Sequence, residues 1–148
     1  MAGSFTDWFE QQILNTAFGS NTTELSTGHW ANLYVGLYSS TAALGDTLTG
    51  LSQGECAGST YDRVAFTNSS SMWSNATGGV KKLKKAITFT TAAGSDWAAI
   101  GAFGIFTTAS TASTAARCLC WTTLTGGAKT INTGDSITVT TALQITLT

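Results

Sequence analysis

Apolar and polar residues alternate with a period of two over much of the chain after residue 30. The clearest alternation lies near the end, where Ile137 and Val139 are separated by threonine, and Leu143 and Ile145 by glutamine. A period of two places the apolar residues on one face of a strand. The pattern predicts seven or so short strands, over residues 33–38, 63–67, 83–90, 97–107, 117–125, 136–140 and 143–148.

The chain has a helical period only near its N-terminus. Ser4 is a suitable N-cap and Gly19 a suitable C-terminal stop, so a helix is predicted over residues 4–19. A single helix of this length is marginally stable alone. Its aromatic face therefore has to dock, either on the sheet of its own chain or on a neighbouring subunit. That face comprises Phe5, Trp8, Phe9, Ile13, Ala17 and Phe18.

Two stretches, residues 39–60 and 68–80, have no clear period and are rich in glycine, serine, threonine and asparagine. They are predicted to be long loops, which are usually functional or ordered by a partner. The second loop carries Met72 and Trp73, and the indole is expected either under its own loop or in a neighbouring subunit. A shorter glycine-containing stretch, residues 126–130, is predicted to be a hairpin turn.

Together these elements predict a mainly β fold, an antiparallel β-sandwich of jelly-roll-like type with one N-terminal α-helix. The length indicates a single domain over residues 1–148, in which residues 30–148 form the sandwich. The strand predicted over 97–107 has two interior glycines, Gly101 and Gly104. They indicate a bend or the close approach of another segment.

Composition adds one unusual feature, the scarcity of charge. Charged residues make up 10% of the chain, whereas ordinary domains carry roughly 25%. The polar positions are filled by 28 threonines and 15 serines, many of them on outward strand positions such as Thr138 and Thr140. Free monomers normally rely on charge to stay apart. We therefore expect much of the surface to face other protein.

The same numbers exclude several classes of function. A net charge of −1 does not suit a nucleic-acid binder, which needs a basic face. No stretch approaches the roughly 18 apolar residues that span a bilayer, so no membrane partner is expected. No catalytic, cofactor or metal site is predicted, because the single histidine, His29, has no partner pattern and a zinc site needs four ligands. The protein is expected not to be an enzyme.

The three cysteines are Cys56, Cys118 and Cys120, and they are interpreted first as small buried apolar residues. The alternative is a disulfide between Cys56 and one of the other two. Cys118 and Cys120 lie two apart on one strand face, where geometry resists a bridge between them. An odd number of cysteines and the lack of a signal-peptide pattern indicate synthesis in a reducing compartment.

One basic cluster stands out, formed by Lys81, Lys82, Lys84 and Lys85. Lysines at the start of a strand commonly prevent edge-to-edge aggregation. Alternatively they form a docking patch for an acidic surface, and attachment would then weaken with salt. Alternation places Lys82 and Lys84 outward and Lys85 inward, near the start of the strand predicted over 83–90.

The order of segments along nearly the whole chain resembles a family of small tailed-bacteriophage virion proteins, often described as tail-fibre-like. Members of this kind also look like the cement or decoration proteins bound outside some capsids. The segments that carry the resemblance are LNTAFG at 14–19, LYVGLYS at 33–39, GSTYDRVAF at 58–66, FGIF at 103–106, LCWTTL at 119–124 and KTINTGD at 129–135, followed by a threonine-rich terminal hairpin.

The resemblance implies a virion structural protein, made in the bacterial cytoplasm. The first hypothesis is a capsid cement protein that binds the major capsid protein on the outer capsid surface as a homotrimer and stabilises the shell. The alternative is a tail or head fibre component binding a host-surface receptor or glycan, with Trp30, Tyr61 and Trp73 as exposed stacking platforms. The predicted contact residues are Phe5, Trp8, Phe9, Met72, Trp73, Lys81, Lys82, Lys84 and Lys85.

Overall fold

The computed structural model describes residues 3–6, 9, 13, 30–42, 44, 54–75, 77, 80–109 and 117–146. Its regular structure in these residues is ten strands, all paired antiparallel, so the mainly β prediction is confirmed. The strands are β1 (Gly3–Phe5), β2 (Asn32–Ser39), β3 (Val64–Thr67), β4 (Val80–Lys82), β5 (Ile87–Thr88), β6 (Trp97–Phe106), β7 (Cys118–Thr123), β8 (Lys129–Ile131), β9 (Thr138–Val139) and β10 (Gln144–Thr146).

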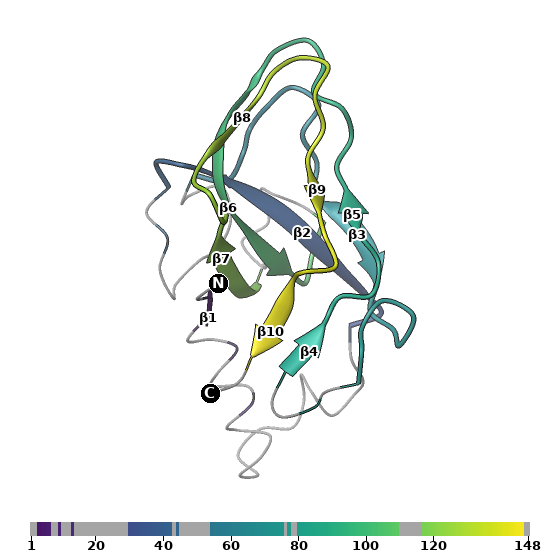
Figure 1. The fold of residues 1–148 in the computed structure, drawn as a ribbon. Coiled ribbons are helices and arrows are strands. Elements are labelled where there is room, and N and C mark those ends of the chain that lie inside the picture. Colours follow the sequence, from purple (N-terminus) through teal and green to yellow (C-terminus); the bar gives the residue numbers. More distant parts are fainter. Residues whose placement is uncertain are drawn as a thin grey trace.

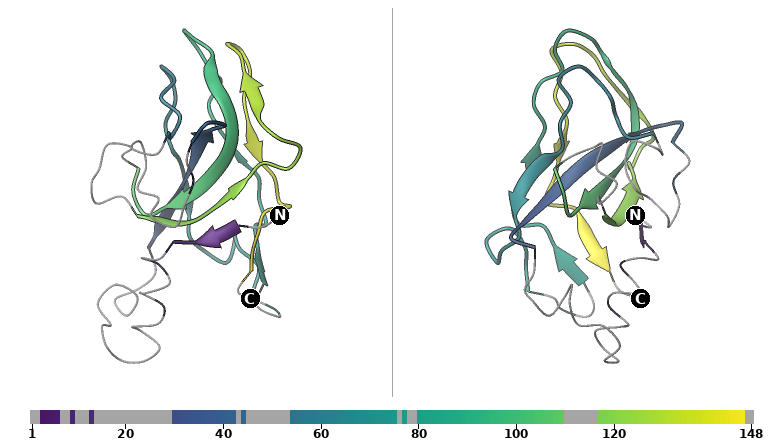
Figure 2. Two further views of the ribbon diagram at one scale, coloured as in Figure 1. Left: turned by 90° about the vertical axis from the view of Figure 1, so that its left-hand side faces the viewer. Right: turned by 180° about the vertical axis from the view of Figure 1, so that it is seen from behind.

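The main sheet is built around β6, its longest strand (Figure 1). The strand order is β1-β7-β6-β2-β3, and β8 pairs with the first part of β6. Figure 2 shows that β6 is strongly curved. Register shifts interrupt its pairing with all three neighbours, and such irregularities bend strands. The glycine at 101 fits this curvature, because a Cβ there would lie 2.7 Å from the Cα of Ser40.

The stretch 126–130 is not a hairpin turn, as the sequence pattern suggested. β7 pairs with Ala102–Phe106 and β8 with the preceding part of β6, so both run in the same direction along one edge. The intervening residues leave the sheet and return to the same edge. Gly126 and Gly127 allow this, since both have a positive φ, of 85° and 80°.

Two short ribbons, β4 with β10 and β5 with β9, lie outside the main sheet. The last two strands therefore do not form the expected terminal hairpin, because each pairs with an earlier strand instead. The predicted strand 83–90 is also interrupted: Leu83 bridges Trp73, and only Ile87–Thr88 pair regularly. A β-sandwich needs a second sheet packed on the first, but the described residues beside the main sheet form two separate two-stranded ribbons. A complete β-sandwich is therefore not confirmed.

The main core lies between the main sheet and the ribbons. Alternate residues of β2, namely Leu33, Val35 and Leu37, are buried there. Leu83 and Ile87 contribute from the ribbon side. Burying each such side chain contributes roughly 1.5–3 kcal/mol, so these contacts hold the layers together.

The opposite face of the main sheet is apolar as well. Tyr38, Ala102, Phe106 and Cys118 are buried in a second cluster, against which Trp121 packs. Burial on both faces explains why β6 is an almost unbroken apolar run rather than an alternating one.

The predicted helix over 4–19 is not shown, and its start is incorrect. Ser4 and Phe5 belong to β1, paired with Trp121 and Cys120 of β7. Their main-chain groups satisfy the edge of β7, which otherwise lacks a strand partner on that side. Thr6, not Ser4, makes the cap-like contact, since its Oγ1 accepts a bond from the N–H of Phe9 at 3.4 Å. Residues 7, 8, 10–12 and 14–19 lie outside the described residues.

Part of the predicted loop 39–60 is ordered against β2. Glu55 forms a bridge with Tyr38, and the N–H of Cys56 donates to the carbonyl of Leu37 at 2.8 Å. The chain thus returns to the main sheet at residues 55–56, between the turn that follows β2 and the turn at 59–60. Residues 43 and 45–53 of this stretch lie outside the described residues.

Replacing Gly101 with alanine tests the close approach inside β6. We expect Gly101→Ala to destabilise the fold by roughly 1–3 kcal/mol, because the added methyl group meets the main chain of Ser40. Chemical denaturation measures the change. Ala98→Ser, at an exposed position of the same strand, should alter stability by less than about 0.5 kcal/mol. Equal stability of the two variants would contradict the close packing.

Candidate functional site

Three separate turns meet at one end of the molecule, which we call the apex (residues 59–60, 91–96 and 132–135). Figure 1 shows them converging above the main sheet. The Oγ of Ser59 donates to the carbonyl of Ala93 at 2.6 Å, and the N–H of Ala93 donates to Thr60 Oγ1 at 3.0 Å. Hydrogen bonds between distant segments therefore fix the first turn to the second.

The second and third turns of the apex are joined by one carboxylate oxygen. Oδ1 of Asp96 accepts bonds from the N–H of Thr133 at 2.6 Å and from its hydroxyl at 3.0 Å. Main-chain bonds between Ala92 and both Gly134 and Asp135 continue the connection. All of these side chains except Ala92 and Thr60 are largely exposed. The apex is thus a polar surface whose turns hold one another in place.

A buried ion pair connects the segment beneath the apex to the main sheet. Arg63 binds Glu55 in a bidentate manner, through Nε to Oε1 and Nη2 to Oε2, both at 2.7 Å. Both side chains are 0% exposed. The remaining guanidinium nitrogen, Nη1, donates to the carbonyl of Thr108 at 3.0 Å. Both charged groups are therefore neutralised and bonded, as burial requires.

Tyr61 extends this network to the backbone of β2. Its hydroxyl donates to Glu55 Oε1 and accepts from the N–H of Leu37, both at 2.8 Å. Burial, followed by the charge of Glu55, raises the pKa of Tyr61, so the hydroxyl stays protonated and available as a donor. Gly36 leaves room for this arrangement, because a Cβ there would lie 2.7 Å from Glu55 Oε1.

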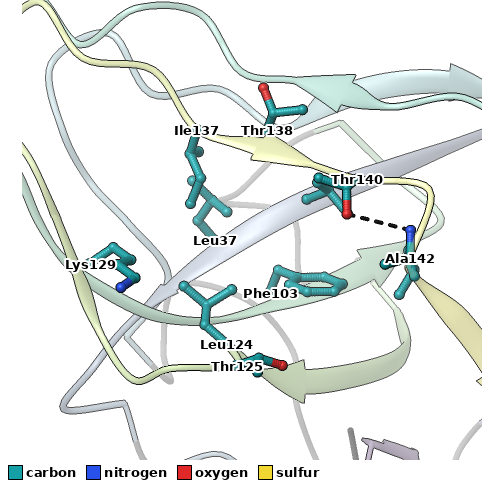
Figure 3. Close-up of a pocket in the computed structure, with 11 residues that line it drawn as sticks. Leu37, Phe103, Leu124, Thr125, Lys129, Ile137, Thr138, Thr140 and Ala142 are labelled. Carbon is teal, nitrogen blue, oxygen red and sulfur yellow. Dashed lines mark hydrogen bonds between the residues drawn. The ribbon is translucent and has the colours of Figure 1, made fainter.

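An apolar groove of about 240 Å³ lies beside β9 (Figure 3). Leu37, Phe103, Leu124 and Ile137 line it, with threonine hydroxyls and Lys129 at its border. Pockets for drug-sized molecules start at about 300 Å³. The groove is therefore sized for one or two apolar side chains.

The lysine cluster lies on β4 and the turn that follows it. All four side chains are exposed, including Lys85, which the alternation placed inward. Since residues 84–86 lie outside β4 and β5, strand alternation does not determine their direction. β4 pairs with β10 on one side, and the carbonyl of Lys82 accepts from the N–H of Ser74 on the other. Because both edges of β4 are occupied, Lys81 and Lys82 do not protect a free edge of that strand. Lys84 and Lys85 precede β5, which among the described residues pairs with β9 only.

One comparison with known proteins identifies the family. The model of the family described as "Podophage GP4 fiber I protein gp80" matches residues 4–148. The chain belongs to this family. It is accordingly a phage virion structural protein of fibre type, which the resemblance noted from the sequence had implied. No curated protein matches the chain.

Several residues predicted to contact other molecules are buried within this fibre-family chain. Trp73 is 3% exposed and packs against Phe66 with ring centroids 5.8 Å apart, so its indole lies under its own loop. Met72 is half-buried against the same core. Tyr61 is also buried, so neither Tyr61 nor Trp73 is an exposed stacking platform.

The N-terminal aromatic residues form a partly exposed group. Phe5 lies 5.3 Å from Phe9 between ring centroids, and Phe9 lies 6.4 Å from Trp30. Phe9 and Trp30 pack partly against the main core, which supports docking on the chain's own sheet. Trp8 lies outside the described residues. The predicted contact role of this group stays a prediction.

The cysteines are free, as first interpreted, and Cys56 and Cys118 are buried. Burial raises the pKa of all three thiols, that of Cys120 to about 12, so they stay protonated near neutral pH. The described residues hold no group of three metal-ligating side chains. In the part of the chain that the structure describes, no helix is long and apolar enough to cross a bilayer.

Sequence patterns missed the residues that organise the apex and the network beneath it. Glu55, Ser59 and Asp96 lie in stretches without a period, and their partners lie 6 to 37 positions away. The sequence offered only weak signals for these residues, namely a glutamate in the long loop 39–60 and an aspartate directly before Trp97. Their pairing depends on how the turns meet in space.

Removing one partner of the buried ion pair is expected to be costly. Arg63→Met should destabilise the fold by about 3–5 kcal/mol, since it leaves the Glu55 carboxylate buried without its counter-ion. The double variant Glu55→Met/Arg63→Met should lose less, because no charge is then stranded. Denaturant unfolding of the four proteins forms a double-mutant cycle. Additive losses would mean that the two residues do not act as a pair.

Proposed function

We propose that this chain is a non-enzymatic fibre component of a tailed-phage virion that contacts the host surface through its apex. The family match supports the fibre role. The apex supports the location of the contact, because exposed Ser59, Ser95, Asp96 and Thr133 gather there from three turns. Hydroxyl, carboxylate and main-chain groups are those that bind a polar ligand such as a host glycan.

The rigidity of the apex favours recognition. Binding costs free energy when loops have to be ordered, roughly 0.5–1.5 kcal/mol for each immobilised side chain. In this chain, bonds such as Ser59 to Ala93 and Thr133 to Asp96 hold the turns before any ligand arrives. A ligand would therefore meet a surface that is already arranged.

The arrangement of strands also favours this orientation. β1 and β10 lie in the half of the molecule away from the apex (Figure 1). Half-buried Phe5 belongs to β1, and half-buried Phe9 packs against it. Attachment to the virion through this half would leave the apex pointing outward.

An arginine placed on the apex tests the proposed contact. Ala93→Arg should reduce host adsorption of phage at least about tenfold, or about 1.4 kcal/mol of binding, while virions still contain the protein. Ala93 suits this test because its side chain is exposed and only its main chain makes apex bonds. Ala128→Arg, on the exposed loop between β7 and β8, adds the same charge elsewhere and should adsorb normally. Normal adsorption by the Ala93 variant would exclude the apex as the contact.

The second candidate is a capsid cement protein, bound as a trimer to the major capsid protein. The lysine cluster favours it, because four exposed lysines form a suitable patch for an acidic capsid surface, and Lys81 and Lys82 lie on a strand whose two edges are occupied. A near-neutral chain that concentrates its positive charge in one place is suited to oriented docking.

Copy number and charge reversal distinguish the two candidates. A cement protein is expected in hundreds of copies per virion and should be lost at high salt, because ions screen contacts between exposed charges. A fibre component is expected in about a dozen copies or fewer, as estimated from the few attachment sites that closed symmetry provides at a tail. Quantitative gel analysis of purified virions gives the number. Lys82→Glu should lower occupancy only in the cement case, with Lys129→Glu as the matched control.

A further inference from the structure

A groove of about 410 Å³ separates the outer edge of the main sheet from the β5–β9 ribbon. β3 forms one wall, and the segment 85–88 with β5 forms the other. No hydrogen bond joins β3 to β5 among the described residues. The groove therefore lies between two strands that each have a partner on the far side only.

The pairing of β3 fixes which of its main-chain groups face the groove. The N–H of Asn68 donates to the carbonyl of Ala31, so this pair is of the hydrogen-bonded type. In an antiparallel ladder these pairs alternate, so Val64 and Phe66 also direct their N–H and C=O groups toward β2. Ala65 and Thr67 direct theirs the other way, and both residues are exposed.

The same reasoning applies to β5. The N–H of Phe89 donates to the carbonyl of Ile137, and Ile87 is opposite Val139, so these residues face β9. Thr88 lies between Ile87 and Phe89, so the same alternation directs its N–H and C=O groups away from β9. In the described residues no partner bonds to the main-chain groups of Ala65, Thr67 or Thr88.

We propose that this groove binds an extended, acidic segment of a partner protein, which adds as a strand to the outer edge of β3. Only an extended polypeptide offers N–H and C=O groups at the spacing of Ala65 and Thr67, two residues apart. The inference goes beyond the proposed apex contact and holds for either location in the virion.

Side chains around the groove define the chemistry of the partner strand. Met72 and Val64 are half-buried apolar residues in its lining, so they suit an apolar side chain at every second position of the added strand. Lys85 is the charged residue of the lining, and Lys84 precedes it. Both lysines are exposed, so acidic residues at the intervening positions of the partner would meet positive charge.

The usual protections of an edge strand are weak at this position. Natural edges carry prolines, charged side chains or a covering segment. β3 has no charged residue between Val64 and Thr67, and the chain contains no proline at all. Its shortness limits unwanted aggregation and suits a partner that pairs over only a few residues.

Nuclear magnetic resonance with a peptide probe tests the proposal on the full chain. The probe is a capped hexapeptide in which glutamate alternates with valine, expected to bind with a dissociation constant on the order of 1 mM or lower. Amide signals of Ala65 and Thr67 should shift and their hydrogen exchange should slow. A peptide with lysine in place of glutamate should bind about tenfold or more weakly.

Two further peptides and four variants make the test specific to strand addition. The two peptides carry methyl groups on alternate peptide nitrogens, one peptide for each of the two phases. The peptide whose methylated nitrogens face β3 should not bind. Thr67→Pro removes an N–H that bonds to no described residue and should prevent binding, whereas Thr67→Val keeps the N–H and should bind normally. Lys85→Glu should weaken binding, and the remote Lys129→Glu should not.

Each outcome decides the matter once unfolding temperatures show that the variants are folded, with Ala65→Pro replacing Thr67→Pro if the latter is not. Loss of binding with proline and with one methylated peptide supports strand addition. Absence of any shift at Ala65 and Thr67 would overturn it. Undiminished binding of both methylated peptides would overturn the backbone part of the proposal. Equal binding of the acidic and basic peptides would overturn the charge part.

Discussion

The Glu55 carboxylate lies where water does not reach, and the arrangement around it follows from the need to neutralise it. Arg63 supplies the charge through two bonds of 2.7 Å, and Tyr61 adds a third donor. These contacts tie the segment 54–63 to β2 and, through Thr108, to the end of β6. The guanidinium also lies 3.6 Å from the centroid of the Phe106 ring, which places it on the second apolar face of the sheet.

This ion pair also supports the apex from below. Ser59 and Thr60, which bond to the turn 91–96, lie between Glu55 and Tyr61 in the chain. Tyr61 packs edge-on against Trp97 at 5.7 Å between centroids, and Gly58 lies directly against the same indole. A polar surface at the tip is therefore held by a polar network and an aromatic group within the fold. The stability of the fold and the geometry of the proposed contact depend on the same few residues.

The long strands of the main sheet were the part of the fold that sequence patterns predicted well. β2 and β6 lie where alternation and apolar runs placed them, and the glycine at 101 does mark a close approach. The pairing partners were not predictable, since β9 and β10 pair with strands about 50 and 60 positions earlier. Local periodicity has no information about such distant partners. The bulge between β7 and β8 looked like a hairpin for the same reason, because only the strand beyond it shows where the chain returns.

The contact surfaces were less predictable than the strands. The lysine cluster was visible in the sequence, but alternation placed Lys85 inward and its side chain is exposed. The burial of Trp73 depends on Phe66 and Leu83, which no local pattern links to it. The apex could not be predicted from the sequence, because serine, threonine and aspartate are frequent in the loops of this chain. Their significance lies in which turns they join, and that information is three-dimensional.

The loop between β7 and β8 has a practical consequence for experiments on whole particles. The chain leaves the edge of β6 after Leu124, whose N–H donates to the carbonyl of Gly101, and returns to it at Lys129. A Cβ on Gly127 would have no atom within 4 Å. An epitope or a fluorophore inserted there would lengthen the loop without changing either strand register. The entropic cost of such an insertion grows only slowly with its length. The position therefore provides a handle for locating the protein within a particle by labelling.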